Sequence, residues 1–171
     1  MTIDLSTRWL GLSLKHPILP GASPLVDDLD TVKRLEDAGA AAITMRSLFE
    51  EQLVADQLAA HRFLDGPSYA DAEAATWLPS TGDFTFGPDA YLEQIRKIRQ
   101  SVDLPVIGSL NGTTPGGWLK YAKLIEQAGA QALELNLYDL PSDPKQSASD
   151  VELQQLEVVR QIQESIKIPV G

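Results

Sequence analysis

The sequence predicts an α/β protein in which helices and parallel strands alternate, and two internal repeats support this prediction. Residues 35–43 (LEDAGAAAI) recur as residues 125–133 (IEQAGAQAL), and residues 101–106 (SVDLPV) recur as residues 165–170 (SIKIPV). The first repeat is typical of a helix that ends at a glycine before a buried strand. In the second repeat a proline prevents the helix from continuing into the strand. Four helix-to-strand junctions in one chain indicate a parallel sheet with right-handed crossovers.

Apolar runs at these junctions give the expected strands. We expect a short hairpin in residues 3–14, followed by strands at residues 17–21, 40–45, 104–110 and 132–137. Both a closed barrel and an open doubly wound sheet fit this order. No G-x-G-x-x-G motif follows the first strand, which disfavours the dinucleotide-binding form of the open sheet.

Start signals and apolar spacing give the expected helices between the strands. The first helix follows a cap at Asp27 or Asp28, and the third begins at a Thr114 cap with Pro115 in its first turn. The second crossover helix starts near Pro88. Its expected inward residues are Leu92, Ile95, Ile98 and Val102.

The fourth helix is expected to open with a capping box from Ser149 to Glu152. Its apolar residues at helical spacing are Leu153, Leu156, Val159, Ile162 and Ile166. Residues 47–61 also look helical, and residues 62–87, rich in Gly, Pro, Ser and Thr, are expected to form an irregular insertion.

Composition excludes several classes of protein. A chain of 171 residues, 43% of them hydrophobic, suits one domain covering residues 1–171. No apolar run approaches the roughly 20 residues of a membrane span, and the N-terminus lacks the features of a signal peptide. The absence of cysteine excludes disulfides and thiolate metal sites, and a net charge of −10 argues against nucleic acid as a partner. We therefore expect a cytoplasmic protein with a small-molecule substrate, no metal and no membrane partner.

The second repeat also bears on how much of a barrel is present. After Val106 the third strand continues to Leu110, whereas after Val170 only Gly171 follows. We therefore expect four βα units, truncated at the start of the fifth strand. Unpaired edges of such a half barrel are expected to favour self-association.

Candidate site residues are expected where strands end, because ligands of parallel α/β folds bind at the carboxyl ends of the strands. Residues 20–25 are small and include the Ser23 hydroxyl, an arrangement that suits either a flat ligand or a tight turn. Arg46 after the second strand suits an anionic ligand or an electron-rich ring, or alternatively a salt bridge to Glu50 or Asp56.

The third and fourth strands add polar residues to this set. Asn111 suits a hydrogen bond to a heterocycle, although Asn-Gly is also ordinary turn chemistry. Glu134 and Asn136 alternate with Leu135 and Leu137, so both polar groups point to one side of the strand. Inside a barrel an amide and a carboxylate need partners, and this pair is the strongest indication of a ligand site.

Four motifs in order resemble the dihydroorotate dehydrogenase family: residues 20–24 (PGASP), 46–52 (RSLFEEQ), 87–92 (GPDAYL) and 134–137 (ELNL). The resemblance spans nearly the whole chain but about half of the family's (β/α)₈ barrel. It implies a TIM-barrel flavoprotein, an oxidoreductase of pyrimidine biosynthesis that holds FMN and converts dihydroorotate to orotate. A base removes a proton from C5 of the substrate while the C6 hydride passes to the flavin.

By resemblance and position together, the residues expected at the flavin are Ala22, Ser23, Arg46, Ser47, Asn111 and Asn136. The residues expected at the substrate are Glu134 and Asn136. The resemblance places the FMN phosphate site beyond Gly171, so FMN binding by this chain alone is expected to be weak or absent.

The chain departs from the family at the catalytic base. The family's Asn-Leu-Ser-Cys-Pro-Asn run reads Asn-Leu-Tyr-Asp-Leu-Pro over residues 136–141, which leaves Tyr138 and Asp139 as the nearest candidates. The family's Asn-x-x-Gly-Leu-Pro-Asn loop has no counterpart in residues 62–87, and its flavin lysine aligns with Met45 or Arg46. These departures indicate a diverged member, for which flavin is better supported than dihydroorotate.

Two alternatives to a flavin oxidoreductase stay open on the sequence. One is a non-catalytic half barrel that self-associates without a cofactor. The other is a flavin-independent (β/α)-barrel lyase that uses Glu134 or Arg46.

Overall fold

The computed structural model describes residues 3–51, 88–112, 115–138 and 142–171. Its main sheet is parallel, with the order β3 (Ile43–Phe49), β4 (Val106–Asn111) and β5 (Ala132–Leu135). Val170 forms a parallel bridge with Leu133 of β5, so the last residues pair with β5 at the edge of the sheet. The expected α/β fold with a parallel sheet is confirmed.

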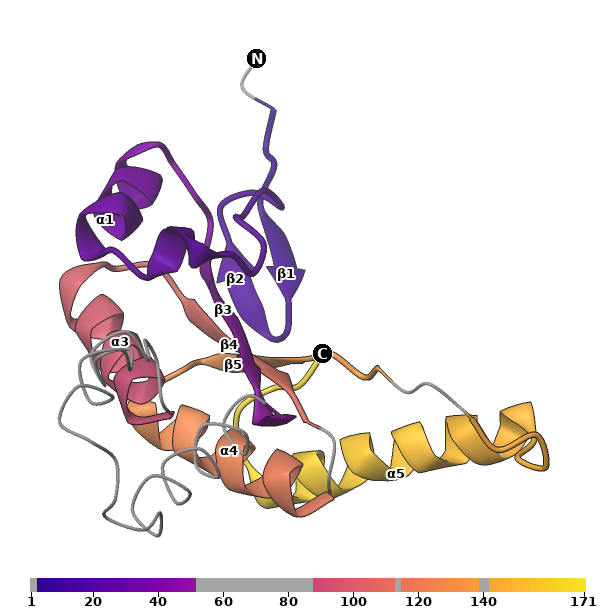
Figure 1. Cartoon of the computed structure of the whole chain (residues 1–171). Coiled ribbons are helices and arrows are strands. Elements are labelled where there is room, and N and C mark those ends of the chain that lie inside the picture. The colour runs from indigo at the N-terminus through magenta and orange to yellow at the C-terminus, as the bar shows by residue number, and fades with distance from the viewer. Residues whose placement is uncertain (1–2, 52–87, 113–114, 139–141) are drawn as a thin grey trace, which may run out of the picture.

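Helices lie between the strands in sequence. They are the short 3₁₀ helix η1 (Pro24–Val26), α1 (Leu29–Asp37), α3 (Pro88–Ser101), α4 (Pro115–Ala128) and α5 (Ala148–Ser165). In Figure 1, α3, α4 and α5 lie on one side of the sheet, and the N-terminal hairpin lies on the other. None of the helices in the described ranges is long and apolar enough to cross a membrane.

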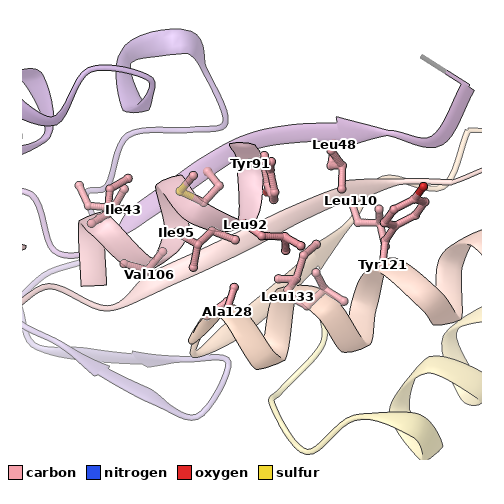
Figure 2. Packing of buried hydrophobic residues seen from close by; sticks show 14 of the residues in the cluster. Ile43, Leu48, Tyr91, Leu92, Ile95, Val106, Leu110, Tyr121, Ala128 and Leu133 are labelled. Carbon is pink, nitrogen blue, oxygen red and sulfur yellow. The ribbon is translucent and has the colours of Figure 1, made fainter. Parts of the chain in front are cut away.

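The main core fills the space between the sheet and its helices. Figure 2 shows Ile95 of α3 packed toward Ile43 and Val106 of the strands, and all three side chains are fully buried. The expected inward residues of α3, from Leu92 to Val102, all lie in this core. Burial of this apolar face, at roughly 25 cal/mol per Å², is what holds the helices against the sheet.

A hairpin of β1 (Thr7–Trp9) and β2 (Leu12–Leu14) covers part of the opposite face, as expected for residues 3–14. Its turn residues Leu10 and Gly11 have φ angles of 49° and 69°, the left-handed pair that a two-residue hairpin loop requires. Leu14 of the hairpin packs in a second, smaller core. The buried members of that core are Leu14, Ala41, Ala42, Ile107 and Ala132. Because Ala42, Ile107 and Ala132 lie at or next to the starts of the three strands, the hairpin closes the amino end of this face.

Several expected element boundaries were wrong. Residues 17–21 form no regular strand, although Ile18 O accepts a hydrogen bond from Ala41 N (3.1 Å). Pro17 and Pro20 supply no N–H, which removes two ladder donors from this segment. Residues 47–49 continue β3 instead of starting a helix. Residues 52–61, the insertion at 62–87 and the Thr114 cap lie outside the described residues.

The start of α5 was also placed too late. Ser147 is the cap, and its side chain and that of Asp150 exchange hydrogen bonds with each other's backbone N–H. The sequence contains two Ser-x-x-acid patterns two residues apart, and the earlier one is used. Leu153 and Leu156, expected on the apolar face, are 64% and 58% exposed, because only the second half of α5 meets the core at Ile162 and Ile166.

Candidate functional site

A β-bulge in β3 decides which of its side chains reach the face under the hairpin. Thr44 is paired with Ile107, and the next pair joins Ser47 to Ser109. Two residues of β3, Met45 and Arg46, therefore stand opposite the single residue Gly108 of β4. Side chains alternate between faces, so one extra residue reverses the faces beyond it. The bulge therefore places the Ser47 hydroxyl where Arg46 would otherwise lie.

Beyond the hairpin, this face carries a cluster of four hydrogen-bonded side chains, which we call the polar cluster: Ser47, Ser109, Glu134 and Asn136. Ser109 is its centre and is completely buried. Its Oγ lies 2.8 Å from Ser47 Oγ, 2.8 Å from Glu134 Oε1 and 2.9 Å from Asn136 Nδ2. Asn136 Nδ2 also donates to Ser47 Oγ at 3.3 Å. Three strands thus contribute to one network.

The direction of these bonds leaves acceptors at the surface of the cluster. Ser109 gives its single hydroxyl hydrogen to Glu134, so Ser47 must donate in its contact with Ser109. The amide hydrogens of Asn136 are both used within the cluster. Glu134 Oε2 and Asn136 Oδ1 have no hydrogen-bond partner in the described part of the chain, and both side chains are half-buried. A ligand above the cluster would be held through its own N–H or O–H groups.

The segment before η1 supplies a donor without a partner. Ser23 Oγ is buried and makes no hydrogen bond to any residue in the described ranges, whereas the preceding Ala22 is exposed. A buried hydroxyl without a partner costs about 1–3 kcal/mol, which a hydrogen bond to a ligand would recover. Gln94 of α3 fixes the neighbouring turn by donating to Val26 O (2.7 Å) and Asp27 O (3.2 Å).

Arg46 lies within β3, in the bulge, and its guanidinium is 3.4 Å from the carboxylate of Asp27. Both side chains are roughly three-quarters buried, at 29% and 26% exposed. This ion pair joins the bulge to the end of η1. It is a salt bridge of the kind expected as the alternative role of Arg46, although Asp27 was not among the expected partners.

Two further residues of the expected site, Asn111 and Tyr138, lie outside the polar cluster. Asn111 ends β4, where it is paired with Phe49, two residues beyond the cluster's Ser109. Tyr138, one of the two candidates for a base, is 77% exposed, so its side chain stands mostly in solvent. Asp139, the other candidate, lies outside the described residues.

A buried carboxylate directly after β3 was not predicted as a site residue. Glu50 is 6% exposed and lies against the first turn of α4, where a Cβ atom on Gly117 would collide with it. The N-terminus of a helix favours negative charge. Burial, together with the charge of Glu50, raises the pKa of Tyr121 on the same helix. Neither residue belongs to the polar cluster.

Ser109 is the site residue that sequence reasoning missed. The alternation of Ile107, Ser109 and Asn111 along the third strand places them on one side, the same argument that selected Glu134 and Asn136. Ser109 opens the stretch in which only Asn111 was predicted as a site residue. No group of three or more His, Cys, Asp or Glu side chains suited to a metal occurs in the described ranges.

No family model matches the chain. It is similar to the "Putative dihydroorotate dehydrogenase A (fumarate)" of Aeropyrum pernix, with 34% identity over 92 residues, covering 47% of this chain and 28% of the relative. It is also similar to the "Dihydroorotate dehydrogenase B (NAD(+)), catalytic subunit" of Endomicrobium trichonymphae, with 27% identity over 176 positions, covering 99% of this chain and 53% of the relative. The chain therefore has distant relatives named dihydroorotate dehydrogenase. The chain spans about half the length of the Endomicrobium trichonymphae relative and about a quarter of the Aeropyrum pernix relative.

Among solved structures, the chain is similar to "a putative phosphonomutase" from Burkholderia cenocepacia J2315, with 19% identity and a TM-score of 0.45 over 84% of this chain and 49% of that one. It is also similar to "a putative dihydrodipicolinate synthetase" from Pseudomonas aeruginosa, with 20% identity and a TM-score of 0.49 over 90% of this chain and 42% of that one. Similarities of this size carry no functional information.

Proposed function

We propose that this chain is part of an FMN-dependent oxidoreductase related to dihydroorotate dehydrogenase, and that its sheet is the first half of a (β/α)₈ barrel. The polar cluster is the observation that carries this proposal. Its face is the one that would become the interior of such a barrel, because the helices cover the other face. The hairpin closes the amino end of that interior, which leaves the cluster at the end where barrel enzymes bind ligands.

The polar groups of the chain suit a flavin ring. Flavin carries a ring N–H flanked by two carbonyl oxygens, so it offers a donor and acceptors along one edge. Asn136 Oδ1 and Glu134 Oε2 are acceptors, and Ser23 Oγ is a buried donor without a partner. When bound, FMN supplies a two-electron acceptor for a hydride from the substrate.

The hydrogen bonds of the polar cluster also indicate which residue would bind the substrate. Glu134 is held by the Ser109 hydroxyl, which leaves one carboxylate oxygen for a substrate N–H or O–H. We propose a small molecule oxidised at a CH–CH bond, with conversion of dihydroorotate to orotate as the specific reaction suggested by the relatives' names. Tyr138 and Asp139, which follow Asn136 in the sequence, stay the nearest candidates for the base.

Titration with FMN, followed by quenching of flavin fluorescence, tests the proposal. Asn136→Ala and Ser23→Ala should each weaken binding about tenfold, the equivalent of one to two hydrogen bonds to ligand. Ser13→Ala on the exposed strand β2 is the matched control and should leave binding unchanged. Binding by the wild-type protein should be weak, as expected from the sequence; its absence at millimolar FMN, or equal binding by all four proteins, would refute the proposal.

A further inference from the structure

Tyr91 on α3 reaches through the core to the backbone of Ser109, the centre of the polar cluster. Its ring is 1% exposed, and Figure 2 shows it pointing from α3 toward the strands. The phenol oxygen lies 3.1 Å from Ser109 N and 3.1 Å from Ser109 O. The hydroxyl accepts from the N–H and donates to the carbonyl, so one side chain binds both backbone groups of one residue.

These backbone groups lie on the β3 side of β4. Pro105 O accepts from Ile43 N of β3, whereas Leu110 O accepts from Asn136 N on the β5 side. Backbone groups alternate along a strand, so those of Ser109 face β3, as those of Pro105 do. The phenol therefore binds Ser109 on the side where β3 bulges, beside its pairing with Ser47.

The contact between the Tyr91 hydroxyl and the Ser109 backbone matters because it lies opposite the bulge of β3. A bulge disrupts the ladder locally and increases its twist, so the strand opposite it gains from an additional donor and acceptor. Without the extra residue, Arg46 would stand opposite Ser109, and a charged side chain would replace the Ser47 hydroxyl in the cluster. The Tyr91 hydroxyl is placed to favour the bulged register over the regular one.

We propose that Tyr91 is a positioning residue for the ligand site: by binding the Ser109 backbone opposite the bulge, it holds Ser47 and Ser109 in register. This inference rests on the proposed function only in taking flavin as the ligand. Burial raises the pKa of Tyr91 far above its usual range, so the hydroxyl stays protonated and keeps donating at every physiological pH.

The test compares Tyr91→Phe with Tyr121→Phe. Both changes remove one hydroxyl from a buried ring of a core helix and keep the ring, so both variants retain the packing of the core. Tyr121 on α4 is the matched control. Each change is also made in a Ser109→Ala background, and FMN affinity and the exchange rate of the Ser109 amide are measured for every protein.

Tyr91→Phe should weaken FMN binding about tenfold and speed exchange of the Ser109 amide about tenfold, the equivalent of losing two modest hydrogen bonds. In the Ser109→Ala background its effect on affinity should largely vanish, because the cluster is already broken. A merely structural loss would instead be the same in both backgrounds and would match Tyr121→Phe, and either result would overturn the proposal.

The two proposals fail separately. If the wild-type protein binds no FMN, the proposed function fails, and amide exchange alone decides the role of Tyr91. Faster exchange at Ser109 in Tyr91→Phe than in Tyr121→Phe then supports the positioning role. Equal exchange in the two variants contradicts it.

Discussion

Replacing Ser109 with alanine removes the centre of the polar cluster and gives the sharpest prediction for stability. The hydroxyl is completely buried and takes part in three hydrogen bonds, one of them to the Glu134 carboxylate. A bond to a charged group contributes about 1.5–3 kcal/mol, and a neutral bond about 0.5–1.5 kcal/mol. The half-buried side chains of Glu134 and Asn136 recover part of this by bonding to water, so we expect a net loss of about 2–3 kcal/mol.

Urea unfolding at pH 7 measures this loss, with Ser13→Ala on the exposed hairpin strand as the control. In thermal unfolding, a loss of this size should lower the melting temperature by roughly 4–12 °C in a domain of this length. The slope of the urea transition should not change, because the surface exposed on unfolding is the same. A change below about 0.5 kcal/mol, the size of an ordinary surface substitution, would refute the account of the cluster.

Three other predictions concern different parts of the chain. Gly117→Ala should cost about 1–3 kcal/mol by forcing a Cβ against the buried Glu50 carboxylate, whereas Gly116→Ala, where a Cβ meets no atom within 4 Å, should be neutral or stabilising in the same thermal unfolding assay. Hydrogen bonds from Arg160 lower the pKa of Glu157 to about 2, so the stability it contributes is present above pH 4.5 and is lost as pH falls toward 2; circular dichroism should show a shallower loss of helix over that interval in Glu157→Gln, and identical curves would contradict the assignment. We also expect the 171-residue chain to self-associate through the edges of its sheet, with a mass in sedimentation equilibrium that rises with concentration; a constant 18.6 kDa would refute this.

Much of the fold was predictable because its signals are local. The repeated junctions are read from helix-ending glycines and strand-opening prolines, and both glycines, Gly39 and Gly129, have the positive φ angles (96° and 103°) that such caps use. The start of α5 was missed by two residues because two capping patterns overlap in the sequence. The prediction of a strand at residues 17–21 was wrong because Pro17 and Pro20 supply no backbone N–H for a sheet, although the residues between them are apolar.

The candidate site was only partly predictable because its geometry depends on contacts between distant residues. Glu134 and Asn136 follow from alternation along one strand. The bulge that exchanges Arg46 for Ser47 carries no local signature, since no glycine or proline marks it. Its consequence appears only when β3 is aligned with a strand about 60 residues later, and the Tyr91 contact with Ser109 comes from a third element.

An amide NMR titration of the protein with FMN tests most directly whether the polar cluster is the flavin site. The account predicts saturable shifts at Ser23, Ser47, Ser109 and Asn136, with no shifts in the hairpin of residues 7–14 at the closed end of the same face. Shifts confined to the hairpin, or none at millimolar FMN, the affinity range in which association gains only about 4 kcal/mol, would contradict it.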